Sequence, residues 1–174
     1  MELKTALNQR KSVRSYTGEP VREEQLARIL TAAYEAPIGM GKYDSLHLTI
    51  ITNRELLDAI DRNAAEFFGR PETHPLYGAS MLIVVSSSLE GNVGSANTAA
   101  VIQNMSLAAV EEGLGSCYIY GATAALAENR ELLAKLKLPE GFFPTGSILL
   151  GETDEPYAAR EIPAEHRFSQ TRID

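Results

Sequence analysis

The sequence contains no tryptophan, one cysteine and three histidines among its 174 residues. A single cysteine, Cys117, excludes an internal disulfide and any metal site built from several cysteines. Cys117 stands in an apolar stretch typical of a strand, so we interpret it as a small buried apolar residue and not as a nucleophile. His47, His74 and His166 form no metal-binding or catalytic pattern with the other residues.

Positive charge and long apolar runs are also scarce. The formal net charge of −7 argues against general nucleic-acid binding, which favours a positive surface. No apolar run approaches the length of a membrane span, and the N-terminal stretch lacks the apolar core of a secretory signal. We therefore expect a cytoplasmic protein with no membrane partner, built as one domain over residues 1–174.

Familiar catalytic motifs are missing as well. HExxH, CxxC, GxGxxG and the Walker pattern do not occur, so neither a metal site nor a dinucleotide-binding Rossmann domain is indicated. No serine, histidine and aspartate arrangement suggests a catalytic triad. If the protein is an enzyme, we expect a bound cofactor to carry the chemistry and predict no catalytic side chain.

The most informative stretch that is present covers residues 97–121. Small and apolar residues lie on nearly every side between residues 99 and 110, which predicts a helix buried on more than one side. Asn97 or Thr98 can cap its start, and the glycines after it can end it. Residues 116–120 then predict a short strand. Such a helix is either an ordinary core helix or one that a partner subunit covers, and both interpretations stay open.

Shorter patterns predict the remaining elements. Strands are expected at residues 47–52, 81–87 and 147–150. Helices are expected at residues 2–11, 23–35 and 128–138, and after a capping box that opens at Thr52. The polar tail, residues 152–174, must lie on some surface if it is ordered, and a second subunit could provide one. Helices that alternate with short apolar strands indicate an α/β or α+β class with one covered sheet.

The densest positive cluster of this acidic chain consists of Arg10, Lys11, Ser12 and Arg14. Two guanidiniums, an ammonium and a hydroxyl suit a phosphate, because arginine offers a bidentate fork and serine a further donor. The alternative is a solvated basic patch at the end of a helix, where the helix dipole favours cations.

Two further stretches could approach a ligand. The loop at residues 37–43 contains two glycines, which let a backbone come close to a bound molecule, although it could equally be a plain connection. Residues 118–121 form the end of a predicted strand, a common ligand position in sheets flanked by helices.

Taken in order, these stretches resemble the FMN-dependent nitroreductase family. Residues 10–16, RKSVRSY, are similar to its N-terminal R-R-S-V-R-x-F/Y motif, and residues 33–51 resemble its A-x-x-A-P-S … F-x-V-V segment. Residues 74–79 resemble its P-x-x-Y-G-A stretch, and residues 97–121 resemble its Q-N-M-x-L-A-A-x-x-x-G-L-G-S helix and strand. The chain is short for the family, so we expect a more open substrate pocket.

The resemblance implies an α+β fold in which helices flank a central, mostly antiparallel sheet. It implies a homodimer that holds FMN at the subunit interface, with an interface helix and a C-terminal tail extended over the other subunit. The implied function is an FMN-dependent NAD(P)H oxidoreductase, which passes a hydride through flavin N5 in a ping-pong cycle. NADH or NADPH would donate, and a nitroaromatic, a quinone or a flavin would accept.

The same resemblance implies the residues that bind the cofactor. Arg10 and Ser12, with Lys11 alongside, would contact the phosphate or the ribityl chain of FMN. Arg14 would reach the pyrimidine edge of the ring. Arg160, beyond the last strand, would bring a further positive charge to the phosphate.

Two other stretches are implied to contact the ring. Met40, Gly41 and Lys42 would lie near the ring or the ribityl chain, and the backbone of Tyr120 and Gly121 would lie near N5. The loop that contains Met40 departs from the Asn-x-Gln-Pro-Trp pattern of the family. That departure motivates an alternative function, an FMN-binding or storage protein without turnover. A domain without flavin is the third interpretation.

Overall fold

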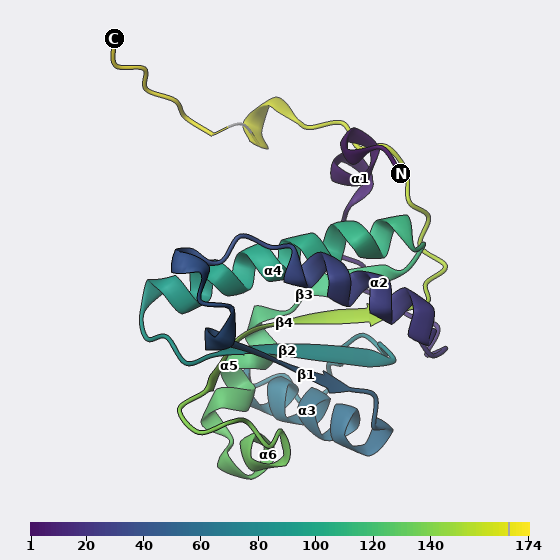
Figure 1. The fold of residues 1–174 in the computed structure, drawn as a ribbon. Helices are drawn as coiled ribbons and strands as arrows, with labels where there is room; N and C mark the ends of the chain where they lie inside the picture. Colours follow the sequence, from purple (N-terminus) through teal and green to yellow (C-terminus); the bar gives the residue numbers. More distant parts are fainter. Residues whose placement is uncertain (167) are drawn as a thin grey trace.

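The computed structural model describes residues 1–166 and 168–174, and a four-stranded sheet lies at its centre (Figure 1). The strand order is β1-β2-β4-β3, and each neighbouring pair is antiparallel. The strands are β1 (Leu46–Ile51), β2 (Met81–Ser87), β3 (Gly115–Tyr118) and β4 (Phe143–Gly151). This arrangement confirms the predicted α+β class with a covered antiparallel sheet.

Helices cover both faces of the sheet (Figure 1). One layer contains α2 (Glu23–Tyr34) and α4 (Asn92–Glu111). The other layer contains α3 (Arg54–Phe67), α5 (Tyr120–Glu128) and α6 (Arg130–Lys135). The short helix α1 (Leu3–Gln9) stands outside the sandwich with the C-terminal tail beside it. Three short 3-10 turns complete the fold, η1 (Gly39–Gly41), η2 (Tyr43–Ser45) and η3 (Ala164–His166).

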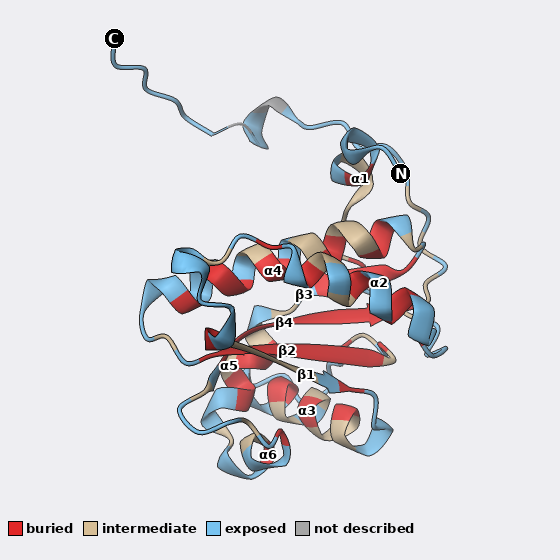
Figure 2. Ribbon diagram, in the orientation of Figure 1, coloured by how far each residue is buried: buried red, intermediate tan, exposed pale blue. Residues whose placement is uncertain are grey.

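The core has two halves, one on each face of the sheet. Ile83 of β2 points toward α2 and α4, whereas its neighbour Leu82 points toward α3 and α5. In β4 the partners of these two residues are Ile148 and Leu149. Successive strand residues face opposite sides, so the apolar run in β2 is buried on both faces, as the sequence predicts. Figure 2 shows β2 and β4 buried along their length.

Helix α4 is buried on several sides, as predicted, but its predicted start is wrong. The helix begins at Asn92, after Gly91 in the left-handed region at φ 72°. Asn97 and Thr98 therefore lie inside it and cap nothing. The Asn97 Oδ1 atom accepts a hydrogen bond from the Gly39 amide, and the Thr98 hydroxyl lies 2.6 Å from that of Thr145. Both polar groups are used in contacts across the fold instead of at a cap.

Other boundaries differ from the predictions at the ends of elements. Asn53, not Thr52, caps α3, because its Oδ1 atom accepts a hydrogen bond of 2.9 Å from the Leu56 amide. Strand β3 ends at Tyr118, and Tyr120 begins α5, a helix that the sequence patterns missed. Among the described residues, no helix has the length and apolar character needed to cross a membrane.

Candidate functional site

The basic segment at residues 10–16 runs along the outer edge of β3. Val13 is fully buried, and its amide donates a hydrogen bond of 2.9 Å to the Ser116 carbonyl. The ring of Tyr16 lies so close to Gly115 and Gly151 that a β-carbon on either would be about 3 Å away. Val13 and Tyr16 thus anchor the segment against the sheet. Arg14, between these two residues, is exposed.

Two guanidiniums approach each other at the start of this segment. Arg10 is the C-cap of α1, where its amide donates to the Ala6 carbonyl at 2.9 Å. Partial burial and then the nearby Arg160 guanidinium lower the pKa of Arg10 from its ordinary value. Within the described part of the chain, neither arginine forms an ion pair with a carboxylate. The structure therefore brings the predicted Arg10 and Arg160 together.

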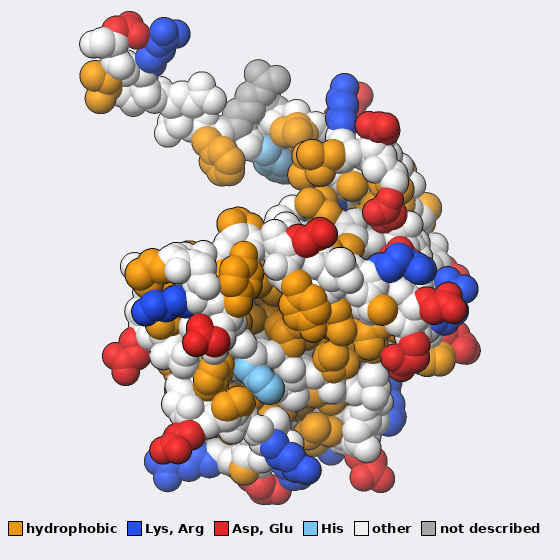
Figure 3. Space-filling model, viewed as in Figure 1, with side chains coloured by type: hydrophobic (Ala, Val, Ile, Leu, Met, Phe, Trp, Pro, Cys, Tyr) orange, Lys and Arg blue, Asp and Glu red, His pale blue; other side chains and the backbone are white. Residues whose placement is uncertain are grey.

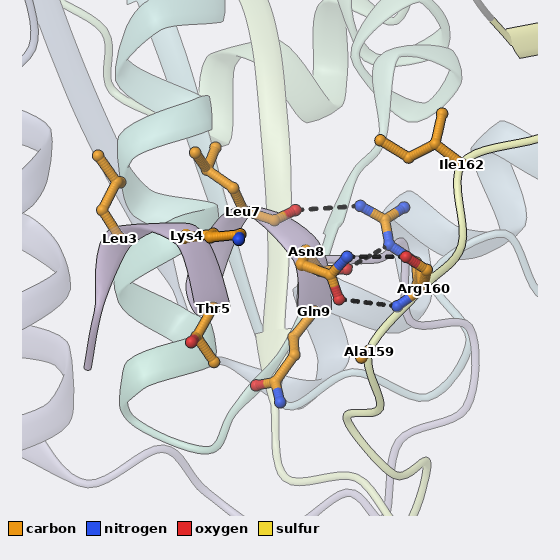
Figure 4. Close-up of a pocket in the computed structure, with 9 residues that line it drawn as sticks. All are labelled: Leu3, Lys4, Thr5, Leu7, Asn8, Gln9, Ala159, Arg160 and Ile162. Carbon is orange, nitrogen blue, oxygen red and sulfur yellow. Dashed lines mark hydrogen bonds between the residues drawn. The ribbon is translucent and has the colours of Figure 1, made fainter.

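Arg160 is also bound to the C-terminal end of α1 (Figure 4). Its Nε atom donates to the Asn8 carbonyl at 2.7 Å, and its Nη2 atom donates to the Leu7 carbonyl at 3.2 Å. The sequence patterns assigned Arg160 to a phosphate and missed this contact with the helix. Part of the guanidinium is hydrogen-bonded to α1, and its charge also acts on Arg10.

Lys11 has a partner that the sequence patterns missed. Its Nζ atom lies 2.8 Å from the Glu155 carboxylate, which also accepts a hydrogen bond of 3.0 Å from the Arg14 amide. The Lys11 ammonium and then the Arg14 amide hold the pKa of Glu155 below its ordinary value. The charge of Lys11 is therefore largely neutralised, unlike that of Arg10.

Ser12 and Arg14 lie on either side of the buried Val13. The Ser12 carbonyl accepts a long hydrogen bond of 3.5 Å from the Arg14 Nη1 atom. Behind this segment, Cys117 is buried in β3, and desolvation raises the pKa of its thiol. Cys117 belongs to the core cluster around β3, so its predicted structural role is confirmed.

The junction of β3 and α5 contains the predicted Tyr120 and Gly121. No side chain caps the start of α5. The first amides of a helix lack acceptors within it, so the amides in this turn are donors available to a ligand. A β-carbon on Gly121 would lie 3.0 Å from the ring of Phe68, so only glycine fits there without displacing that ring.

Two consecutive aromatic residues at the end of α3 were not predicted as site residues. The rings of Phe67 and Phe68 meet edge to face with centroids 5.1 Å apart, and about half of each side chain is exposed. Two large aromatic residues in succession are the signal in the sequence that could have revealed them, since neighbouring positions of a helix do not share one face. Next to Phe68 lies a cleft of about 540 Å³, which is lined also by Arg70, Thr73, His74, Pro75 and Tyr77.

The loop with Met40, Gly41 and Lys42 lies elsewhere in the chain. It is held near the start of α4, where the Gly39 amide donates to Asn97, whereas α1 is ion-paired through its N-terminus to Glu111 at the other end. These two positions on α4 are separated by about 20 Å at 1.5 Å per residue. A single chain therefore does not bring this loop to the basic segment.

The surface around this loop is apolar. Met40 is 74% exposed and has a left-handed backbone at φ 58°. Tyr34 and Tyr43 are exposed nearby, over a small cleft lined also by Leu46 and Leu48. Figure 3 shows large hydrophobic side chains gathered on this face, over α2 and β1. Such a patch is typical of a surface that another molecule covers.

Comparison with known proteins decides the family. The family model described as "Nitroreductase family" matches residues 7–152, most of the chain. The chain belongs to the nitroreductase family. This confirms the resemblance drawn from the motifs, and the match includes the basic segment, α4 and the junction of β3 with α5.

Individual relatives agree with this nitroreductase assignment. A protein of Methanothermobacter thermautotrophicus named "Putative NADH dehydrogenase/NAD(P)H nitroreductase" is 30% identical, over 93% of this chain and 83% of the relative. The "NADPH-flavin oxidoreductase" of Vibrio harveyi is 24% identical, over 94% of this chain and 73% of the relative. A crystal structure of a nitroreductase with bound FMN from Bacteroides fragilis shares the fold, with a TM-score of 0.83 at 24% identity over 98% of this chain and all of that one.

Proposed function

We propose that this nitroreductase-family protein is an FMN-dependent NAD(P)H oxidoreductase that acts as a homodimer. Its relatives carry names of NAD(P)H-dependent nitroreductases and flavin oxidoreductases, and structural neighbours from Bacteroides fragilis and Desulfitobacterium hafniense were crystallised with FMN. Three features along one edge of the sheet support the proposal. They are the pair of guanidiniums of Arg10 and Arg160, which we call the anion seat, the backbone donors at the start of α5, and an exposed aromatic surface.

The observation that carries the proposal is the approach of Arg10 and Arg160. Two like charges held together repel, and after partial burial the Arg160 charge is the second cause that lowers the pKa of Arg10. A bound anion removes the repulsion, and a phosphate can accept paired hydrogen bonds from a guanidinium. The Ser12 side chain, two residues after Arg10, would add a hydroxyl donor, whereas Lys11 is already occupied by Glu155. The residues present therefore fit the phosphate end of FMN.

The other end of the same edge fits a flat ring. From Ser116, which holds Val13, to Tyr120 the chain advances by roughly 13 Å at the spacing of a strand. There the uncapped first turn of α5 offers amides of Tyr120 and Gly121, and Phe68 offers apolar surface. Arg14 contributes a positive charge between the two ends, which favours electron density on a ring beside it.

When bound, FMN would supply the hydride chemistry, and the residues of the chain would bind and orient it. Arg10 and Arg160 would fix the anionic end, and the amides at the start of α5 would orient the ring through hydrogen bonds. The half-exposed rings of Phe68 and Tyr120 would provide a stacking surface for the nicotinamide of NADH or NADPH and for a small aromatic or quinone-like acceptor.

The partner subunit would complete the site. An exposed face of α4 carries small or uncharged side chains, at Val93, Ala96, Ala99 and Gln103, and such a face permits close packing with a second copy. Because the loop with Met40, Gly41 and Lys42 lies far from Arg10 in its own chain, we propose that it reaches the cofactor of the partner. On this view the exposed apolar patch around Tyr34 and Tyr43 is covered in the dimer.

The first experiment is the visible absorption spectrum of the purified protein, followed by release of the chromophore by heat. We expect a yellow protein that releases about one FMN per chain, as a single site per chain requires. Anaerobic NADH or NADPH should then bleach the flavin, and repeated turnover with a quinone or a nitroaromatic would exclude the storage function. A colourless protein that does not take up added FMN would overturn the proposal.

A further inference from the structure

Asn8 of α1 and Arg160 of the tail are joined by a reciprocal pair of hydrogen bonds (Figure 4). The Asn8 Nδ2 atom donates to the Arg160 carbonyl at 2.7 Å, and the Arg160 amide donates to the Asn8 Oδ1 atom at 2.8 Å. The carboxamide of Asn8 thus pairs with the tail backbone as a neighbouring strand would. The Arg160 guanidinium adds a third hydrogen bond to Asn8, at its carbonyl, and a fourth to the carbonyl of Leu7, so four hydrogen bonds join Arg160 to the end of α1.

This contact stabilises a helix that has little support of its own. Helix α1 has seven residues, fewer than an isolated helix needs in water. The last carbonyls of a helix lack a hydrogen-bond donor within the helix, and Arg160 donates to those of Leu7 and Asn8. The end of α1 and the tail at Arg160 therefore stabilise each other.

The position of the contact ties this mutual stabilisation to the anion seat. Arg10 lies two residues after Asn8, directly at the end of α1, and Arg160 is itself the bonded tail residue. The same four hydrogen bonds consequently fix the Arg160 guanidinium and the end of α1 from which Arg10 extends. They also keep Arg160 near Arg10, where the two charges repel, and an anion between them relieves that repulsion.

We propose that Asn8 is a positioning residue, which couples docking of the tail on α1 to binding of a phosphate monoester by Arg10 and Arg160. Because coupling is reciprocal, a bound phosphate stabilises the docked tail, and the docked tail raises phosphate affinity. The ligand class is the phosphate end of FMN, so this inference rests on the proposed function. Asn8 itself touches no ligand in this scheme and acts only through the two arginines.

The test compares FMN with riboflavin, which has the same ring and no phosphate. In Asn8→Ala protein the dissociation constant for FMN should rise about tenfold, since the charge-assisted contacts lose their alignment. The constant for riboflavin should change by less than about twofold, which is within the effect of a surface substitution. Gln9→Ala is the matched control, because Gln9 lies on the same short helix and its side chain has no hydrogen bond among the described residues.

Hydrogen exchange provides the readout that separates positioning from mere folding. In the wild type, FMN should slow exchange in residues 3–9 and 156–166 more than riboflavin does, and in Asn8→Ala protein this difference should vanish. If the substitution left the ratio of the FMN and riboflavin dissociation constants unchanged, the role of Asn8 would be overturned and the proposed function would stand.

A wild type that binds neither flavin would overturn the proposed function instead. The coupling is then decided with inorganic pyrophosphate as the probe. Slower exchange of residues 156–166 in pyrophosphate, present in the wild type and absent in Asn8→Ala protein, would support the coupling. No protection in the wild type would overturn it.

Discussion

The sandwich and the unit formed by α1 with the tail are held by different forces. In the sandwich, Leu149 and Ile83 are fully buried between two helical layers. In the outer unit, Leu3 and Leu7 of α1 and Ile162 of the tail leave about half or more of their side chains exposed. They line an open groove of about 730 Å³ between the helix and the tail. Hydrogen bonds and ion pairs hold this unit to the rest, and within α1 the buried residue is the small Ala6.

The difference shows which part of the chain buries its own apolar side chains and which part leaves them exposed. Hydrophobic burial is the dominant favourable contribution to folding, and in this chain the two core clusters lie in the sandwich. The outer unit contributes charged groups to the candidate site yet leaves apolar surface that a second copy can cover. The candidate site therefore lies where the buried core meets an edge that is held mainly by polar contacts.

The largest expected effect is on the free energy of unfolding, when a leucine is replaced by alanine in each of the two regions. Leu149→Ala should lower the free energy of unfolding by about 2–5 kcal/mol, because it leaves a cavity in the centre of the sheet. Leu7→Ala, at a half-exposed position, should cost less than about 1 kcal/mol in the isolated chain. Chemical denaturation measures both. A loss at Leu7 that equals the loss at Leu149 would show that α1 belongs to the cooperative core.

The sequence patterns predicted the sandwich better than its edges. The run in β2 is apolar because two helical layers cover it, so a local pattern contains the necessary information. The start of α4 was placed at Asn97 because asparagine favours helix caps, but a contact with Gly39 uses that side chain instead. Helix α5 was missed because Gly121 suggested a stop, while packing against Phe68 keeps the glycine inside the helix.

The candidate site shows the same limit. The basic segment was identified from local sequence, and its position on β3 could be inferred from no local pattern. Lys11 and Glu155 are 144 residues apart, and Asn8 and Arg160 are 152 apart. Such pairs depend on how the tail returns to the first helix. Sequence patterns gave the charges of the site, and the fold determines which of them remain available for a ligand.

An effect of intermediate size is expected on FMN affinity, when each of the adjacent cations Arg10 and Lys11 is replaced in turn. Arg10→Ala should weaken FMN binding by about 1.5–3 kcal/mol, the typical contribution of a charge-assisted hydrogen bond. Lys11→Ala should weaken it by less than about 1 kcal/mol, since the ion pair with Glu155 already engages this partly exposed ammonium. Fluorescence titration with FMN measures both constants. Equal losses would mean that Lys11 leaves Glu155 to bind the ligand.

The smallest expected effect concerns the docking of the tail as a function of pH. The hydrogen bonds from Lys11 and from the Arg14 amide lower the pKa of Glu155 in the folded protein below its ordinary value of 4.5. Its contribution is therefore fully present above pH 4.5 and is lost as the pH falls through the lower folded value. In the wild type, proteolysis of the tail should accelerate over that acidic range.

Glu155→Gln removes the titrating carboxylate, so its tail should be cut faster than that of the wild type at neutral pH and should lack this acceleration. The control is Glu152→Gln, which changes a neighbouring carboxylate outside the ion pair and should retain the acceleration of the wild type. If Glu155→Gln retained it as well, another group would control the docking of the tail.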